Sequence, residues 1–305
     1  MNLFKKNCKP LLLFLFLFCP FAYSKVSSFW TGIAGIIIKD ETATLVFDVT
    51  LTRPNIFNWI LNRQYISNTH LVKETFSKLQ INHVDGIFAS HTHFDHAVDL
   101  PAIANLFRGT LHGAESLKNL TTSYAKIHKL KTLQFQDMIS ENKIVVGAFT
   151  ITPFIRSHSS IIQFIDWDFL PGSFSSDSTL AFFDYKVGET WAYLIEHPKG
   201  KVFIDQGSQP DRTILAKLPH NISYAFIGVA NKKSIVDFVD GYGKTFKDAK
   251  EIIPMHFDWF LMDLFYKPAI MPGMELDKFP VALIESGSKA KWSIPILFEE
   301  KILFQ

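Results

Sequence analysis

Three histidines and an aspartate occupy six positions of the stretch ASHTHFDHAVDL, residues 89–100: they are His91, His93, Asp95 and His96. His91 and His93 are two residues apart, so in an extended segment their rings point to the same side and can share one metal ion. Asp95 and His96 follow where the chain turns toward a helix, so they can face a second metal ion. Imidazole and carboxylate without thiolate favour zinc, with iron or manganese as alternatives.

Four residues cannot fill two metal sites, and three later residues offer further ligands. Each comes at the end of an apolar, strand-like segment: His158 after TITPFIR, Asp205 at the end of KVFID, and His256 after EIIP. Ligands of α/β proteins gather at the carboxyl ends of strands, so these side chains are expected near the cluster. Taken singly, Asp205 is equally well explained as a turn former, and a lone histidine is seldom a ligand.

The elements that must position these residues alternate between strand-like and helical patterns. Apolar, β-branched runs at 32–39 and 43–49 predict a hairpin, and 84–90 predicts a buried strand that ends where the cluster begins. Apolar residues at helical spacing predict helices at 69–80, 96–107 and 233–243. Further strands are predicted at 143–155, 178–185, 190–197, 201–205, 224–229 and 251–255. Strands accompanied by helices in both halves predict one layered α/β domain over 25–305, with sheets inside and helices outside.

Residues 1–24 have the pattern of a secretory signal peptide. Lys5, Lys6 and Lys9 precede an apolar run, and small residues lead up to a cleavage site expected after Ser24. One alternative is a membrane anchor, but the apolar run of about a dozen residues falls short of the ~20 that span a bilayer. The other is a lipoprotein signal at Cys19, which the bulky Phe18 before it disfavours. The sequence therefore predicts a periplasmic or secreted protein without a stable membrane span after cleavage.

Cleavage at this site changes what the composition implies. Both cysteines, Cys8 and Cys19, lie in the removed segment, so the mature chain has no disulfide and no cysteine-rich zinc site. The formal charge of +2 includes three lysines of this segment, and without them 28 basic residues face 29 acidic ones. With no basic stripe in the sequence, nucleic-acid binding is not expected. The expected partner is a small-molecule substrate, and the sequence carries no sign of an oligomeric state.

In order, HTHFDH, His158, Asp205 and His256 resemble the ligand motifs HxHxDH…H…D…H of the metallo-β-lactamase-fold superfamily. The resemblance covers essentially all of 25–305 and implies an αββα sandwich with the metals at one edge. It also implies two ligand sets and a bridging carboxylate: His91, His93 and His158; Asp95, His96 and His256; and Asp205. Asp48, in LVFDV, resembles the early-strand aspartate that supports the ligand loop from behind, although a strand-end cap is an alternative.

Asp205 stands where the best-known β-lactamases have a cysteine ligand. The chain therefore looks more like the lactonase, glyoxalase-II and phosphodiesterase branches, and like the bacterial Zn-dependent hydrolases of this fold. That resemblance implies two zinc ions and the hydrolysis of an ester, lactone or phosphodiester, with Asp95 orienting the nucleophile. Two alternatives stay open: an iron-dependent oxidoreductase of the same fold, and a non-catalytic, zinc-stabilised binding protein.

Two stretches, 164–174 and 257–274, are unusually aromatic for loops. One interpretation is packing within the core, and the other is an apolar wall or lid around a substrate site. The second interpretation predicts a partly apolar substrate, such as an acylated lactone or a lipid-like ester.

Overall fold

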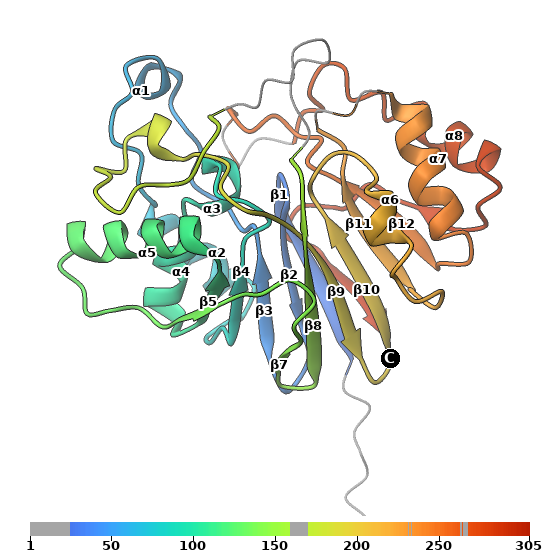
Figure 1. Cartoon of the computed structure of the whole chain (residues 1–305), viewed down its shortest axis with the longest axis horizontal. Helices are drawn as coiled ribbons and strands as arrows, with labels where there is room; N and C mark the ends of the chain where they lie inside the picture. The colour runs from blue at the N-terminus through green and yellow to red at the C-terminus, as the bar shows by residue number, and fades with distance from the viewer. Residues whose placement is uncertain (1–24, 159–169, 231, 233, 263, 265–267) are drawn as a thin grey trace, which may run out of the picture.

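The computed structural model describes residues 25–158, 170–230, 232, 234–262, 264 and 268–305 (Figure 1). The predicted signal segment and residues 164–169 of the first aromatic stretch lie outside the described residues. Two seven-stranded sheets pack against each other, and helices cover both outer faces (Figure 1). The predicted αββα sandwich is confirmed.

The first sheet has the strand order β14-β1-β2-β3-β4-β5-β6. Its strands are β1 (Val26–Gly32), β2 (Gly35–Lys39), β3 (Thr44–Phe47), β4 (Gly86–Phe88), β5 (Thr110–Gly113), β6 (Phe135–Asp137) and β14 (Glu300–Phe304). Strands β3 to β6 run parallel, whereas β14, β1, β2 and β3 pair antiparallel. Asp48 follows β3, and the histidine cluster follows β4. Because these two strands are parallel, both lie at the same edge of this sheet.

The second sheet has the order β13-β12-β11-β10-β9-β8-β7. Its strands are β7 (Ile144–Val146), β8 (Phe149–Arg156), β9 (Thr190–His197), β10 (Gly200–Asp205), β11 (Tyr224–Gly228), β12 (Glu251–Met255) and β13 (Lys291–Trp292). Strand β9 is antiparallel to both β8 and β10, and β10 to β13 are parallel. The carboxyl ends of β8, β10 and β12 therefore share one edge, as predicted for His158, Asp205 and His256.

Helices on the two outer faces complete the layers. They are α1 (Ile56–Ile60), α2 (Thr69–Lys78), α3 (Phe94–Ala97), α4 (Leu100–Phe107), α5 (Glu115–Ile127), α6 (Arg212–Leu215), α7 (Ile235–Thr245) and α8 (Phe279–Glu285). Figure 1 shows α2, α4 and α5 beside the first sheet and α6, α7 and α8 beside the second. Within the described part of the chain, none of these helices combines the length and apolar character that a bilayer span requires.

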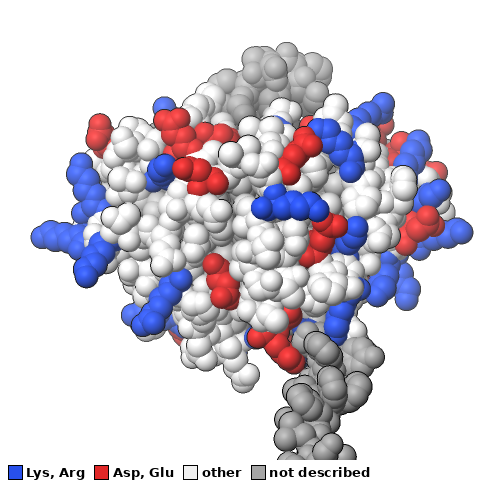
Figure 2. Space-filling model, turned by 60° about the horizontal axis from the view of Figure 1, so that its bottom comes forward, with Lys and Arg blue, Asp and Glu red and all other residues white. Residues whose placement is uncertain are grey.

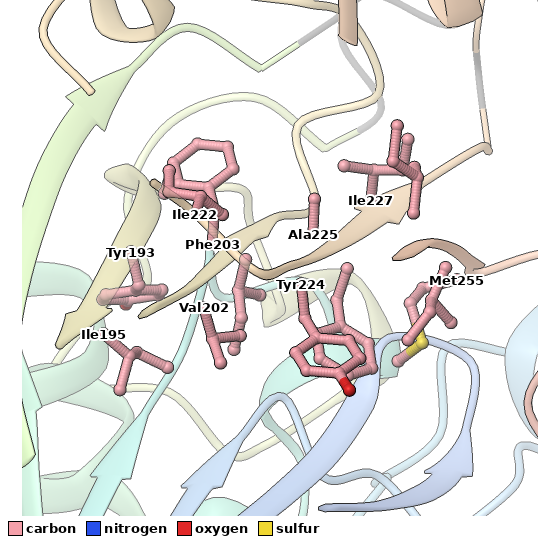
Figure 3. Packing of buried hydrophobic residues seen from close by; sticks show 14 of the residues in the cluster. Tyr193, Ile195, Val202, Phe203, Ile222, Tyr224, Ala225, Ile227 and Met255 are labelled. Atoms are coloured by element: carbon pink, nitrogen blue, oxygen red, sulfur yellow. The ribbon is translucent and has the colours of Figure 1, made fainter. Parts of the chain in front are cut away.

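The sheets are apolar on both faces because each is covered twice. In β2, Ile36 and Ile38 belong to the core cluster that includes both sheets, whereas Ile37 belongs to the cluster that includes α2, α4 and α5. Phe47 of the first sheet contacts Tyr193 of the second, with ring centroids 5.3 Å apart. Figure 3 shows Tyr193 packed among side chains of β9, β10 and β11. Double coverage explains why these strands read as continuous apolar runs.

Most predicted elements are confirmed, including the β2–β3 hairpin, α2, β4, β9 to β12 and α7. The predicted helix over 96–107 is interrupted after α3 and resumes as α4, with Pro101 in its first turn. The predicted strand over 143–155 is two antiparallel strands joined at Gly147, whose φ is +58°. A Cβ on Gly147 would lie 2.5 Å from Thr42 Oγ1, so this tight turn requires glycine.

The strand predicted over 178–185 is wrong. The segment holds one isolated bridge, at Ala181, and then a short 3₁₀ helix, η1 (Phe182–Asp184). The Asp184 carboxylate accepts hydrogen bonds from Ser178 Oγ (2.6 Å) and Ala181 N (2.9 Å), which closes the turn. Phe182 packs against Phe94, with ring centroids 4.4 Å apart, so tertiary contacts override the apolar pattern.

Candidate metal centre

The structure brings six of the predicted ligands into two groups: His91, His93 and His158; and Asp95, His96 and His256. Within each group the candidate ligand atoms lie within 4.8 Å of one another. Five of the six side chains are buried, and His158 is half-buried. Each residue follows the carboxyl end of β4, β8 or β12. Strand β4 belongs to the first sheet and the other two belong to the second, so the site forms where the strand ends of both sheets meet.

The first group holds two ring nitrogens at close range. His91 Nε2 lies 3.0 Å from His93 Nδ1, and the His158 ring centroid is 4.7 Å from that of His91. Tetrahedral zinc with Zn–N bonds of about 2.0–2.1 Å spaces its nitrogen ligands about 3.3–3.4 Å apart. The spacing in this group therefore fits a shared cation.

The second group has the same character with a carboxylate in place of one imidazole. His96 Nε2 lies 3.1 Å from His256 Nε2, and Asp95 Oδ2 lies 3.2 Å from His256 Nε2. The distance from Asp95 Oδ2 to His96 Nε2 is 3.9 Å. Three donor atoms thus converge on one point.

The two groups are neighbours. The rings of His91 and His96, one from each group, have centroids 3.8 Å apart. All six residues line one cavity of about 300 Å³. The donor sets and their adjacency fit a dinuclear metal centre.

Burial sets the charge states that a metal centre needs. Burial, together with the neighbouring imidazoles of His96 and His158, holds the pKa of His91 well below its usual value, so its ring is neutral. Burial alone would raise the pKa of Asp95, but His96 and His256 outweigh it, and this pKa lies well below its usual value. Neutral imidazole and ionised carboxylate are the forms that bind metals.

Asp48 contacts the ligand loop from behind, at the place where the sequence predicts a supporting aspartate. Its Oδ1 accepts a hydrogen bond from Ser90 N at 2.6 Å, and its Oδ2 lies 3.4 Å from His96 Nδ1. Ser90 Oγ lies 3.0 Å from His91 Nδ1. Because these contacts involve the Nδ1 atoms, the Nε2 atoms of both histidines face the ligand groups.

Residues of the site include several with left-handed backbones, which residues other than glycine seldom adopt; Ser208, in the cavity lining, is one, with φ of +64°. Asp48, with φ of +50°, and His256, with φ of +57°, are two others. The His256 amide donates to Ile33 O at 2.8 Å, which ties this residue to the turn between β1 and β2. Such backbone strain is held in place by surrounding contacts and is concentrated at functional sites.

Asp205 lies in neither ligand group. Its Oδ1 accepts from Arg156 Nη1 and from Gly207 N (3.0 Å), and its Oδ2 accepts from Tyr242 Oη (2.8 Å). Asp205 ends β10 with its side chain toward α7, where Tyr242 lies. The bridging role that the resemblance implies for Asp205 is therefore not the arrangement seen here, and it stays a prediction.

Gln206, the next residue, is the one that faces the metal cavity. Its side chain is buried, and among the described residues neither amide atom has a hydrogen-bond partner. Alternation along an extended chain sends Asp205 and Gln206 to opposite sides. A buried amide without a protein partner beside two ligand groups fits a cavity that binds a polar group or an ion.

The sequence alone did not single out Arg156, Tyr242 or Gln206. The sequence did contain a signal for Arg156. This arginine ends an apolar strand two residues before the candidate ligand His158, and an arginine buried there requires a counter-ion. Tyr242 lies on the buried face of the predicted helix. Only the register of β10 shows which of Asp205 and Gln206 faces the cavity.

The second aromatic stretch serves as packing and as a wall. Phe257 stacks on Trp30, with centroids 5.1 Å apart, and belongs to the core. Phe260 and Met271 line the metal cavity. In the described end of the first stretch, Phe174 is buried against Tyr185, which supports the packing interpretation there.

Residues 30–161 match the family model of the metallo-beta-lactamase superfamily. The match includes Asp48, the HTHFDH cluster and His158, and it ends before Asp205 and His256. No curated protein sequence matches the chain.

Solved structures with the same fold cover nearly the whole chain. A metallo hydrolase from the hyperthermophilic archaeon Ignicoccus hospitalis has 13% identity and a TM-score of 0.55, over 91% of this chain and 97% of that one. An isothiocyanate hydrolase from Delia radicum gut bacteria has 14% identity and a TM-score of 0.54, over 91% and 99%. CmlA, a diiron β-hydroxylase from Streptomyces venezuelae, has 11% identity and a TM-score of 0.54, over 93% and 54%.

The αββα sandwich and its paired histidine and aspartate groups define the class: a protein with a metal centre at the edge of two sheets. The family-model match assigns residues 30–161 to the metallo-β-lactamase superfamily, and the solved structures share the fold of nearly the whole chain.

Proposed function

We propose that the chain is a dinuclear zinc-dependent hydrolase that acts on a small, partly apolar ester, lactone or phosphodiester. The observation that carries the proposal is the contact between two three-ligand groups within one cavity. A closed structural zinc site uses one tetrahedral ligand set, whereas paired sets of three protein ligands leave positions for water and substrate. The donor set without thiolate supports zinc.

Two bound zinc ions would lower the pKa of a water from about 15.7 toward about 7 and polarise the oxygen of the substrate. The chain's own residues then orient the reactants. The Asp95 carboxylate, ionised and buried at the cavity, accepts a hydrogen bond from the attacking water and directs it to the substrate. Phe94, Phe260 and Met271 line the same cavity and exclude bulk water from one side.

The test combines metal analysis with a substrate panel. Purified protein is expected to contain about two zinc ions per chain and to hydrolyse a member of a panel of phosphodiesters, lactones, thioesters and β-lactams. Asp95→Ala should lower that activity by at least about a hundredfold. Asp137→Asn, which alters an exposed aspartate of β6, is the control and should leave activity unchanged.

Other outcomes of the metal analysis and the substrate panel would favour the oxidoreductase or the non-catalytic binding protein. Iron in place of zinc with no hydrolysis would favour the oxidoreductase, and bound zinc with no hydrolysis of any panel member would favour the binding protein. Full activity of Asp95→Ala with its metal intact would reject the mechanism.

We also propose, from the pattern of residues 1–24 alone, that the protein is exported to the periplasm or secreted and that residues 25–305 form one domain. N-terminal sequencing of the exported chain tests this proposal, with Lys25 expected as the first residue. Recovery of the full chain inside cells, with Met1 retained or the N-terminal segment intact, would reject it.

Charge on the surface gives no reason to expect nucleic acid as a partner. On the face shown in Figure 2, positive and negative side chains of the described residues are interspersed. A small-molecule substrate is therefore the proposed partner. A gel-shift assay with DNA and RNA at low salt should show no binding.

A further inference from the structure

A second cavity, of about 890 Å³, lies beside the metal centre. Residues 51–57 form one side, and Trp259, Leu261 and Met262 line another. Asn68 and three residues of α2, His70, Leu71 and Glu74, also belong to the lining. Phe260, between Trp259 and Leu261 in sequence, lines the metal cavity instead. Segment 259–262 is therefore the wall between the two cavities.

Part of the rim of this second cavity is apolar and open to solvent, whereas the exposed side chains of His70 and Glu74 make another part polar. Phe57 is 68% exposed and Met262 is 42% exposed, and α1, to which Phe57 belongs, buries none of its residues. Ile56 and Trp259 are exposed to similar degrees. Apolar side chains gathered around a hollow mark a binding site, because packing alone would bury them.

A buried cation lies in the lining. The Arg53 side chain is 8% exposed, and its nearest counter-ion atom, Asp258 Oδ2, lies 3.7 Å from Nη2. Among the described residues, Arg53 Nε and Nη1 have no hydrogen-bond partner. A guanidinium carries five N–H donors, and buried donors are normally satisfied.

The surrounding chain holds Arg53 in place without saturating it. Asp258 shares its carboxylate, since Oδ1 accepts from Ile33 N at 2.8 Å. A Cβ on Gly32 would lie 2.4 Å from Arg53 Nη2, so glycine makes room for the guanidinium. Buried guanidinium donors without a partner in the lining of a cavity suit a carboxylate, because charge-assisted hydrogen bonds between the two groups are strong.

We propose that this cavity binds an amphipathic anion: an alkyl chain with a terminal carboxylate, whose head pairs with Arg53. The chain of the ligand lies against Phe57, Trp259 and Met262. This inference goes beyond the proposed hydrolysis, because binding here needs no turnover and uses no residue of the two ligand groups.

The test is calorimetric titration of the purified, metal-loaded protein with decanoate, decanesulfonate and decan-1-ol, each below micelle-forming concentrations. Both anions are expected to bind, and the alcohol is expected to bind at least about tenfold more weakly. The sulfonate separates this site from the metals, because it is a poor zinc ligand. Binding of decanoate without decanesulfonate, or equal binding of the alcohol and the anions, would overturn the proposal.

Arg53→Met should weaken binding of both anions by about tenfold to a hundredfold. The control is Arg212→Met, which removes an exposed arginine at the start of α6 and should change nothing. Unchanged affinity in folded Arg53→Met protein would overturn the proposal.

A surface pair decides the matter if Arg53→Met does not fold. Phe57→Glu places a negative charge at the rim and should weaken binding of both anions by at least about tenfold. Ile60→Glu is the matched control, because Ile60 is in the same helix and 65% exposed but does not line the cavity. Equal effects of the two variants, or no effect of Phe57→Glu, would overturn the proposal.

Discussion

Arg156 and Asp205 form a buried ion pair between the ends of β8 and β10, with side chains 2% and 1% exposed. Burial alone would lower the pKa of Arg156, but the Asp205 carboxylate outweighs it and raises this pKa above its usual value. Arg156 Nη2 also donates to Gln209 O at 2.8 Å. The pair thus ties the strand that leads to His158 to the turn that supplies Gln206 to the metal cavity.

Asp205→Asn should destabilise the fold and leave metal binding intact. The substitution leaves Arg156 buried without its counter-ion, which costs about 3–5 kcal/mol. Since Asp205 lies in neither ligand group, the content of bound metal should stay the same. Urea unfolding and elemental analysis measure the two effects, with Asp137→Asn as the exposed control. Loss of about one metal ion per chain at unchanged stability would instead support the bridging role.

Asp48→Asn should weaken metal binding. The amide cannot carry the negative charge that now lies 3.4 Å from His96 Nδ1, so His96 becomes a poorer ligand. Loss of such an outer partner typically lowers metal affinity by about 10- to 100-fold. Competition against a zinc chelator measures the change. The control, Asp85→Asn, alters an aspartate that caps Thr44 N away from the site, and an equal effect there would refute the explanation.

Removal of the metals should lower stability. A ligand that binds only the folded state, at about a hundred times its Kd, stabilises it by about 2.7 kcal/mol. Thermal unfolding with and without a chelator should therefore show a drop in Tm that zinc restores. His96→Gln should lose most of this response, because it removes a ligand of the second group. Identical melting curves under both conditions would argue against a metal centre.

Stability should fall with acid because of His112, which is buried against Phe88. Burial lowers the pKa of His112 to about 4, from a usual value near 6.5. The unfolded chain therefore takes up its proton first, so this contribution is complete above pH 6.5 and is lost as the pH falls toward 4. Full loss corresponds to about 3 kcal/mol.

Urea unfolding at pH 7 and pH 5 tests this effect. His112→Leu should reduce the difference in unfolding free energy between the two pH values. His70→Leu is the control, since His70 has a side chain 90% exposed and should leave the pH dependence as it is. The same pH dependence in His112→Leu as in the unsubstituted protein would reject the assignment to His112.

The sequence by itself determined the layered fold, because continuous apolar strands alternating with amphipathic helices can be buried only in a sandwich of sheets between helices. It also predicted seven candidate ligands at strand ends, and the structure gathers six of them into two groups, without Asp205. It did not predict several elements: β1, β5, β6, β13, β14, α1, α5, α6 and α8. Strands β13 and β14 take their places by pairing with β12 and β1, which lie far away in the sequence.

Only the tertiary structure decided which of two adjacent residues faces the metal cavity. Asp205 and Gln206 differ by one position, and strand register alone sends the carboxylate to Arg156 and the amide to the cavity. The tertiary structure also decided the position of Arg53, which no sequence motif marks. Arg53 lines a cavity because residues 51–57 and 259–262 come together in the fold. Contacts between distant segments carry no local pattern, since they arise from how the sheets and loops pack.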